Sequence, residues 1–198
     1  MPLFIKNKLL FIHIPRTGGT SIEKFLERKG ETISLFTATG SIFINKHTPQ
    51  HCTFRELEDL GCISNDVRIF SILRNPIDRT ISDYFYFKEH RPDIFETFKN
   101  FNGFLNKYLN ENNSSLFDNH NLSNYEYLAD HTGIISEKIT IFKFFDIPEI
   151  EKFLGFKGLS QFNHYKTLKE PLEISKKNLK RMKDYFSEDF NLFDYAGE

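Results

Sequence analysis

Apolar residues in this chain gather in short runs that suit buried β-strands. Three runs are rich in β-forming residues: LLFIHI at 9–14, VRIFSIL at 67–73 and KITIFKF at 138–144. Runs of this length are typical of strands buried on both faces of a parallel sheet. The first run belongs to the stretch MPLFIKNKLLFIHIP, which we interpret as the first strand, and ETISLF and SIFI are predicted as further strands.

Helix-starting signals lie between these runs. Residues 20–23 (TSIE) and 53–56 (TFRE) fit the capping-box pattern, in which a hydroxyl and a carboxylate satisfy the first backbone N–H groups of a helix. Pro76 suits the first turn of a helix that runs to about residue 90. The stretch 92–122 is helical in patches and Asn-rich, and it is predicted to be the mobile or substrate-facing part.

The order of these elements predicts the fold class. Strands that alternate with helices indicate an α/β protein with three α/β/α layers and a mainly parallel central sheet. Residues 9–13 and 67–73 are the predicted inner strands. The sequence contains neither an internal repeat nor a linker, so 1–198 is interpreted as one domain.

Composition narrows the function classes. The formal net charge is −1, with 26 basic and 27 acidic residues, which argues against a nucleic-acid-binding surface. The longest apolar runs fall short of the ~18 residues of a membrane span. Without an export signal, Cys52 and Cys62 are expected to be reduced, and the protein is expected to be cytoplasmic.

The stretch HIPRTGGTS at 13–21 lies between a predicted strand and a predicted helix. Backbone N–H groups at such a glycine turn, together with a helix N-terminus, form an anion site. Hydroxyls add donors, and an arginine adds charge with a planar donor fork. The candidate anion-binding residues are Arg16, Thr17, Gly18, Gly19, Thr20 and Ser21. An ordinary capped turn is the alternative interpretation.

A second polar group follows the strand at 67–73. Arg74 stands just past the end of that strand, and Ser82 lies eight residues on, in the next helix. Ligands of open parallel sheets bind outside the carboxyl ends of the strands, so the two side chains are predicted to converge on a second phosphate. The alternatives are a surface ion pair between Arg74 and Asp78 and a solvated helix face at Ser82.

Together, PRTGGTS and the later R-N-P-x-D-R-x-I-S-x-Y resemble the two signature sites of sulfotransferases that use 3′-phosphoadenosine-5′-phosphosulfate (PAPS). The closest resemblance is to the branch with P-K-T-G-G-T-S, which includes heparan-sulfate-type carbohydrate enzymes and small bacterial members. PQHCTFREL and FDNHNLSNYEYL are also similar to that branch. The resemblance implies that the first loop holds the 5′-phosphosulfate and that Arg74 and Ser82 hold the 3′-phosphate. It implies a hydroxyl-bearing acceptor, with carbohydrate as the expected class.

One residue departs from the family pattern. Arg16 stands where these enzymes carry Lys, whose role is to contact the leaving phosphate. Arg keeps the positive charge and the donors but is bulkier and does not release a proton. We therefore expect Arg16 to stabilise the leaving group and not to act as a proton donor.

Sulfuryl transfer to a hydroxyl needs a general base. The resemblance places a catalytic histidine at His51, with His47 as the next candidate, and places His120 near the substrate cleft. His13, at the end of the first strand, is predicted to be a packed core residue. The leaving group is already anionic and the sequence shows no convincing metal-ligand spacing, so no metal is expected.

Two other functions remain open on the sequence. A P-loop kinase or nucleotide hydrolase would need the pattern G-x-x-x-x-G-K-[ST], but Ile14 stands in place of its first glycine and no Lys precedes the hydroxyls. A non-catalytic module that binds a nucleotide or a glycan on the same fold is the other alternative, and the Arg16 departure keeps it open.

Overall fold

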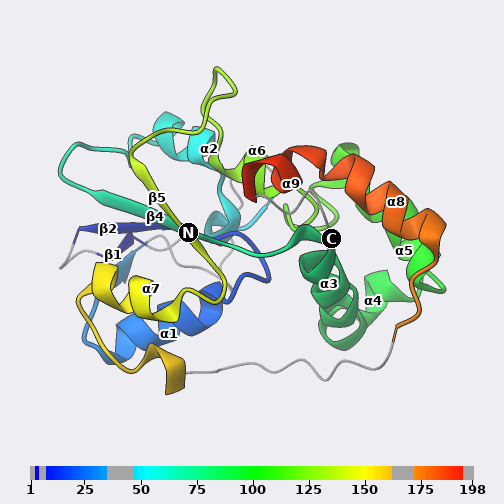
Figure 1. The fold of residues 1–198 in the computed structure, drawn as a ribbon, viewed down its shortest axis with the longest axis horizontal. Coiled ribbons are helices and arrows are strands. Elements are labelled where there is room, and N and C mark those ends of the chain that lie inside the picture. The colour runs from blue at the N-terminus through cyan, green and yellow to red at the C-terminus, as the bar shows by residue number, and fades with distance from the viewer. Residues whose placement is uncertain (1–2, 5–7, 35–46, 162–171, 194–198) are drawn as a thin grey trace.

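A computed structural model of the chain describes residues 3–4, 8–34, 47–161 and 172–193 (Figure 1). Its centre is a five-stranded sheet in the order β3-β1-β2-β4-β5. The strands are β1 (Leu3–Phe4), β2 (Leu9–Ile12), β3 (Ile33–Ser34), β4 (Arg68–Leu73) and β5 (Ile139–Lys143). The prediction of SIFI as a strand falls outside the described residues.

The three long strands run parallel, as predicted. Leu9 of β2 lies opposite Arg68 of β4, and Ile69 of β4 lies opposite Ile139 of β5. The carboxyl ends of these strands therefore meet at one edge of the sheet. The amino-terminal stretch, however, is two strands and not one, since β1 pairs antiparallel with β2. The break falls near Lys8, whose φ of 49° is left-handed.

Side chains of β2 alternate between two apolar layers. Leu10 and Ile12 pack on one face of the sheet with residues of α2 (Phe54–Asp59) and α6 (Asn124–Leu128). Leu9 and Phe11 pack on the opposite face.

Helices α1 (Gly19–Arg28) and α7 (Ile147–Leu154) cover that opposite face (Figure 1). β2 is buried at every residue and β4 at all but its first, as expected for strands covered on both faces, whereas the edge strand β5 is partly exposed. The three-layer α/β/α fold with a mainly parallel sheet is confirmed.

A third apolar cluster forms a helical body beside the sheet (Figure 1). Its helices are α3 (Pro76–His90), α4 (Pro92–Phe95), α5 (Phe101–Tyr108), α8 (Lys176–Tyr185) and α9 (Ser187–Phe193). Single 3₁₀ turns complete the described elements: η1 (Pro49–His51), η2 (Glu111–Asn113) and η3 (Leu159–Gln161).

The stretch 92–122, predicted to be mobile or to face substrate, carries much of this third cluster. Phe98, Phe104 and Phe117 are almost fully buried there and lie against one another. Aromatic contacts of this kind fix a segment whose helices are individually too short to be stable.

Helix starts were predicted with mixed success. The capping box at Thr53 and Glu56 is present. The box predicted for residues 20–23 is wrong, because α1 begins at Gly19 after a left-handed Gly18 (φ 85°) and has no side-chain cap. Glu23 is buried and turned to other partners. A capping box at Ser123 that sequence reasoning missed begins α6.

The structure also bears on the two cysteines and on membrane spans. Cys52 and Cys62 are both free thiols. Among the residues that the structure describes, no helix has the length and apolar character needed to cross a membrane.

We predict that Asp189→Ala lowers the free energy of unfolding by about 2–4 kcal/mol, because it leaves buried N–H groups unpaired. Asp189 is fully buried in α9, and its carboxylate accepts the backbone N–H groups of Asn124 and Tyr125, at 2.9 Å each. Urea denaturation measures the change. Glu188→Ala, at an exposed position of the same helix, is the control. Equal midpoints for the two variants would contradict this role for Asp189.

Candidate active site

The loop between β2 and α1 turns sharply at two left-handed residues, Arg16 (φ 63°) and Gly18 (φ 85°). The buried hydroxyl of Thr17 donates to the carbonyl of Ile14 at 2.8 Å, so it braces the turn. Thr20 and Ser21 fall in the first turn of α1, where N–H groups and the helix dipole favour an anion.

Both positions in this loop need glycine, because neighbouring side chains lie too close to admit a Cβ atom. A Cβ atom on Gly18 would lie 2.9 Å from the ring of Phe144, and one on Gly19 would overlap the ring of His13. The backbone can therefore approach its surroundings, and a phosphate group, more closely than any other residue would permit. These observations fit a phosphate-binding turn better than an ordinary capped turn.

Arg74 and Ser82 lie against this loop. Arg74 Nη1 donates to the carbonyl of Arg16 at 3.0 Å, and its guanidinium packs over the ring of Phe144. Arg16 Nε donates to Ser82 Oγ at 3.2 Å, and Ser82 is only 2% exposed. The alternative of a solvated helix face at Ser82 is therefore wrong. The two predicted phosphate motifs form one continuous basic site.

A buried carboxylate connects this basic site to the histidines. Asp83, fully buried on α3, accepts from His120 Nδ1 at 2.7 Å and from the Tyr108 hydroxyl at 2.5 Å. Its nearer oxygen lies 4.0 Å from Arg16 Nε. Burial alone would raise the pKa of Asp83, but His120, Arg16 and Arg79 hold it below its ordinary value. The carboxylate is therefore ionised.

Three imidazoles lie beside the loop in edge-to-face contact, and we call His13, His51 and His120 the histidine row. The ring centroids of His13 and His51 lie 5.4 Å apart, and those of His51 and His120 lie 4.8 Å apart. Each ring has its Nδ1 atom on a carboxylate, which is Glu23 for His13, Asp118 for His51 and Asp83 for His120.

His51 occupies the middle of the row. Burial lowers its pKa to about 4, and the neighbouring His120 and His13 lower it too, although Asp118 acts in the opposite direction. His51 is therefore neutral near pH 7, as a general base must be. Burial raises the pKa of Asp118, but His51, the backbone N–H of Thr48 and His120 together lower it below its ordinary value, so this carboxylate stays ionised.

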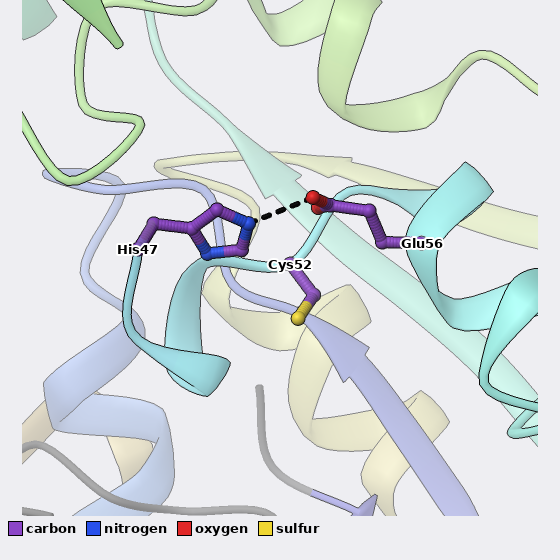
Figure 2. Close-up of side chains that lie close together, drawn as sticks. All are labelled: His47, Cys52 and Glu56. Atoms are coloured by element: carbon purple, nitrogen blue, oxygen red, sulfur yellow. Dashed lines mark hydrogen bonds and ion pairs between the residues drawn. The ribbon is translucent and has the colours of Figure 1, made fainter. Parts of the chain in front are cut away.

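His47 is engaged elsewhere. Its Nε2 atom pairs with Glu56 at 2.7 Å (Figure 2). Its Nδ1 atom bonds the carbonyl of Thr48 at 2.9 Å. Since both partners only accept hydrogen bonds, both ring nitrogens donate. Burial lowers the pKa of His47, but these partners raise it overall. A protonated imidazole has no lone pair to offer as a base.

Cys52 lies next to the His47–Glu56 pair, and one ligand atom from each of the three residues falls within 4.8 Å of the others. In Figure 2 the sulfur points away from the hydrogen-bonded pair. Burial raises the pKa of Cys52 to about 12, so the thiol is protonated, whereas metals bind the thiolate. Glu56 is also committed to the capping box of α2. The group fits a structural role.

Sequence reasoning missed three residues of the site. Asp83 and Asp118 were passed over, although each lies next to a motif residue. Arg79, within the second motif, is 1% exposed and donates to the side chain of Asn124 at 2.8 Å and to two backbone carbonyls, those of His120 and Leu122. The letters R-N-P-x-D-R contained this signal, but only its first arginine was used.

A sequence model described as "Sulfotransferase family" matches residues 4–196. The chain belongs to the sulfotransferase family. Searches of curated proteins and of solved structures gave no match. Members of this family are PAPS-dependent enzymes, so this sulfotransferase takes PAPS as its donor.

We predict that Gly19→Ala weakens binding of 3′,5′-adenosine diphosphate, the desulfonated donor, by about 1–3 kcal/mol. The added methyl group would overlap the buried His13 ring, so either the ring or the loop must move. Overpacking of this kind costs about 1–3 kcal/mol. Isothermal calorimetry measures the affinity. Gly133→Ala, at a glycine with no atom within 4 Å of the added Cβ, is the control and should bind normally. Normal binding by Gly19→Ala would show that the loop does not hold the nucleotide.

Proposed function

We propose that this sulfotransferase moves the sulfuryl group of PAPS to a hydroxyl of a carbohydrate acceptor. One observation carries the assignment of its site. The two phosphate motifs, Arg16 to Ser21 and Arg74 with Ser82, join directly through hydrogen bonds, and the neutral His51 lies in the adjacent row of histidines. Positioning and charge stabilisation are what this chemistry requires of a protein.

The proposal divides the donor between the two motifs. The loop Arg16–Ser21 holds the 5′-phosphosulfate, since its glycines permit close backbone approach and α1 begins there. Arg74 and Ser82 hold the 3′-phosphate. The half-buried Arg74 supplies a charge at the carboxyl end of β4, where ligands of parallel sheets bind.

Arg16 has two contacts that suit its proposed role. Its guanidinium lies over the ring of Tyr86, with the carbon at 4.8 Å from the ring centroid, and its Nε bonds Ser82. Asp83 behind it balances its charge. Arg16 therefore reaches the boundary between the two phosphate positions and stabilises the charge that develops on the leaving phosphate.

His51 is the proposed general base. It is neutral, buried, and held at the sheet edge by the 3₁₀ turn η1 in front of the capped helix α2. His47, the other candidate in this loop, is paired through both nitrogens. His120 lies next in the row and also stacks against Tyr86. We assign His120 to binding the acceptor, together with the segment that precedes it.

The acceptor class rests on the likeness of PRTGGTS, PQHCTFREL and FDNHNLSNYEYL to the carbohydrate branch of the family. A screen of hydroxyl-bearing acceptors with radiolabelled PAPS tests it. Transfer to a saccharide and not to phenols or steroids supports the proposal. Transfer only to a non-carbohydrate hydroxyl would overturn the acceptor class and leave the donor site untouched.

We predict that Arg74→Ala weakens binding of 3′,5′-adenosine diphosphate by about 1.5–3 kcal/mol, the scale of a charged hydrogen bond. Binding of 5′-AMP, which lacks the 3′-phosphate, should change much less. Calorimetry with both nucleotides makes the comparison. Arg68→Ala, at the exposed start of the same strand, is the matched control. Equal losses for the two nucleotides would remove Arg74 from the 3′-phosphate site.

We predict that His51→Ala lowers turnover by ~10²–10⁴-fold while nucleotide affinity stays normal, because a general base contributes on that scale. Steady-state kinetics and calorimetry separate the two effects. His47→Ala is the control and should lose less. If His47→Ala proves the more damaging change, the roles of the two histidines are reversed.

The pH dependence of the wild type follows from the same residue. Since only neutral His51 accepts a proton, kcat/KM should fall as the imidazole is protonated. Burial lowers its pKa to about 4, so activity should persist well below the ordinary histidine value of ~6.5. A fall in kcat/KM centred near that ordinary value would mean that an exposed imidazole is the base.

A further inference from the structure

The backbone at Asp118 is held more tightly by its surroundings than that of an ordinary surface aspartate. It follows the buried Phe117, and both Asp118 (φ 52°) and Asn119 (φ 63°) have left-handed backbones. Such conformations carry a cost and persist only where the surroundings enforce them. Here the aromatic cluster holds Phe117 on one side, and Asn119 donates to the carbonyl of His51 at 3.2 Å on the other. The turn aims the Asp118 carboxylate at His51.

The carboxylate is fixed by three donors. The backbone N–H of Thr48 donates to Oδ1 at 2.5 Å, and the hydroxyl of Thr48 donates to Oδ2 at 2.9 Å. His51 Nδ1 lies 2.8 Å from the same Oδ2 atom. Because an ionised carboxylate can only accept, Nδ1 must carry the proton of the neutral imidazole. The lone pair is then on Nε2.

We propose that Asp118 is the positioning residue of this sulfotransferase: it fixes the tautomer of His51 in which Nε2 is the proton-accepting atom. The inference rests on the proposed role of His51 as base. In the step, the acceptor O–H bond breaks and its proton goes to Nε2, while the acceptor oxygen bonds sulfur. The bond from sulfur to the bridging oxygen breaks, and its electron pair leaves with the 5′-phosphate. Asp118 then faces the imidazolium and stabilises it.

The other groups around His51 show why the Asp118 carboxylate matters for the protonated state of the base. The titratable groups that face the ring are Asp118, His120 and His13. The two histidines disfavour a positive charge on His51, and their own carboxylates, Asp83 and Glu23, are bonded to them and not to His51. Asp118 is the one group among these neighbours that favours the protonated state of the base.

The first test reads the tautomer directly. In protein labelled with ¹⁵N-histidine, two-bond ¹H–¹⁵N correlation spectra show which ring nitrogen is protonated, and the signals of His51 are those missing from His51→Ala. We expect Nδ1 protonated and Nε2 unprotonated in the wild type. A proton on Nε2 in the wild type would overturn the proposal, whatever the activity.

The second test uses two substitutions that a purely structural role would rank in the opposite order. In Asp118→Asn, the N–H of Thr48 must face the amide oxygen, which turns the NH₂ group toward His51 Nδ1. That NH₂ group donates, so Nδ1 must accept, and the proton moves to Nε2. Asp118→Ala imposes no tautomer, although it removes more contacts. We therefore expect Asp118→Asn to lose ~10²–10⁴-fold in kcat, the contribution of a general base, and Asp118→Ala to lose less.

Calorimetry with 3′,5′-adenosine diphosphate serves as the folding control, and both variants should bind it within about twofold of the wild type, because the printed bonds of Asp118 go to Thr48 and His51 and not to the proposed phosphate contacts. A loss in Asp118→Ala at least as large as in Asp118→Asn, with Nδ1 still protonated in both, would overturn the proposal. If His51→Ala itself keeps its activity, the proposed function fails. If His51→Ala is inactive and Asp118→Asn is fully active, the inference about Asp118 fails alone.

Discussion

The buried carboxylate of Asp83 is the constraint on which the rest of the site depends. An unpaired charge in such a position is prohibitively costly, so its partners are obligatory. They come from three parts of the chain: Tyr108 from the aromatic body, His120 from the segment before α6, and Arg16 from the phosphate loop. The Asp83 side chain thereby couples the packing of the helical body, the placement of the histidine row and the charge of Arg16.

The site lies where two differently built parts of the molecule meet. The parallel strands bring their carboxyl ends together and present the phosphate loop and Arg74 at one edge. The helical body supplies Ser82, His120 and Asp118 from a frame of packed aromatic rings. Within that frame, Arg79 of α3 donates to the carbonyls of His120 and Leu122, both just before α6, which keeps the His120 segment against α3. A rigid frame of this kind lets catalytic groups keep their orientation.

The phosphate loop shows how local strain and packing work together. Arg16 has a left-handed backbone, which is costly for a residue with a Cβ atom. The loop keeps this conformation for three reasons. The Thr17 hydroxyl donates a hydrogen bond to a carbonyl within the turn, and Arg74 donates one to the carbonyl of Arg16. The ring of His13 packs closely against Gly19. Arg16 thus carries its donors to Ser82 without loss of the turn.

The sequence by itself determined the three parallel strands and the fold class, because these depend on the local spacing of apolar runs and helix signals. It also indicated the two candidate phosphate motifs, a glycine turn and polar residues just past a strand, but it did not show that the amino-terminal stretch is two strands. It also indicated His51. Only the tertiary structure decided what state His51 is in and which carboxylate orients it, since Asp118 is 67 residues away along the chain. Asp83 likewise meets His120 across 37 residues. Hydrogen bonds between buried charges follow three-dimensional proximity, and no periodicity in the sequence encodes such a pairing.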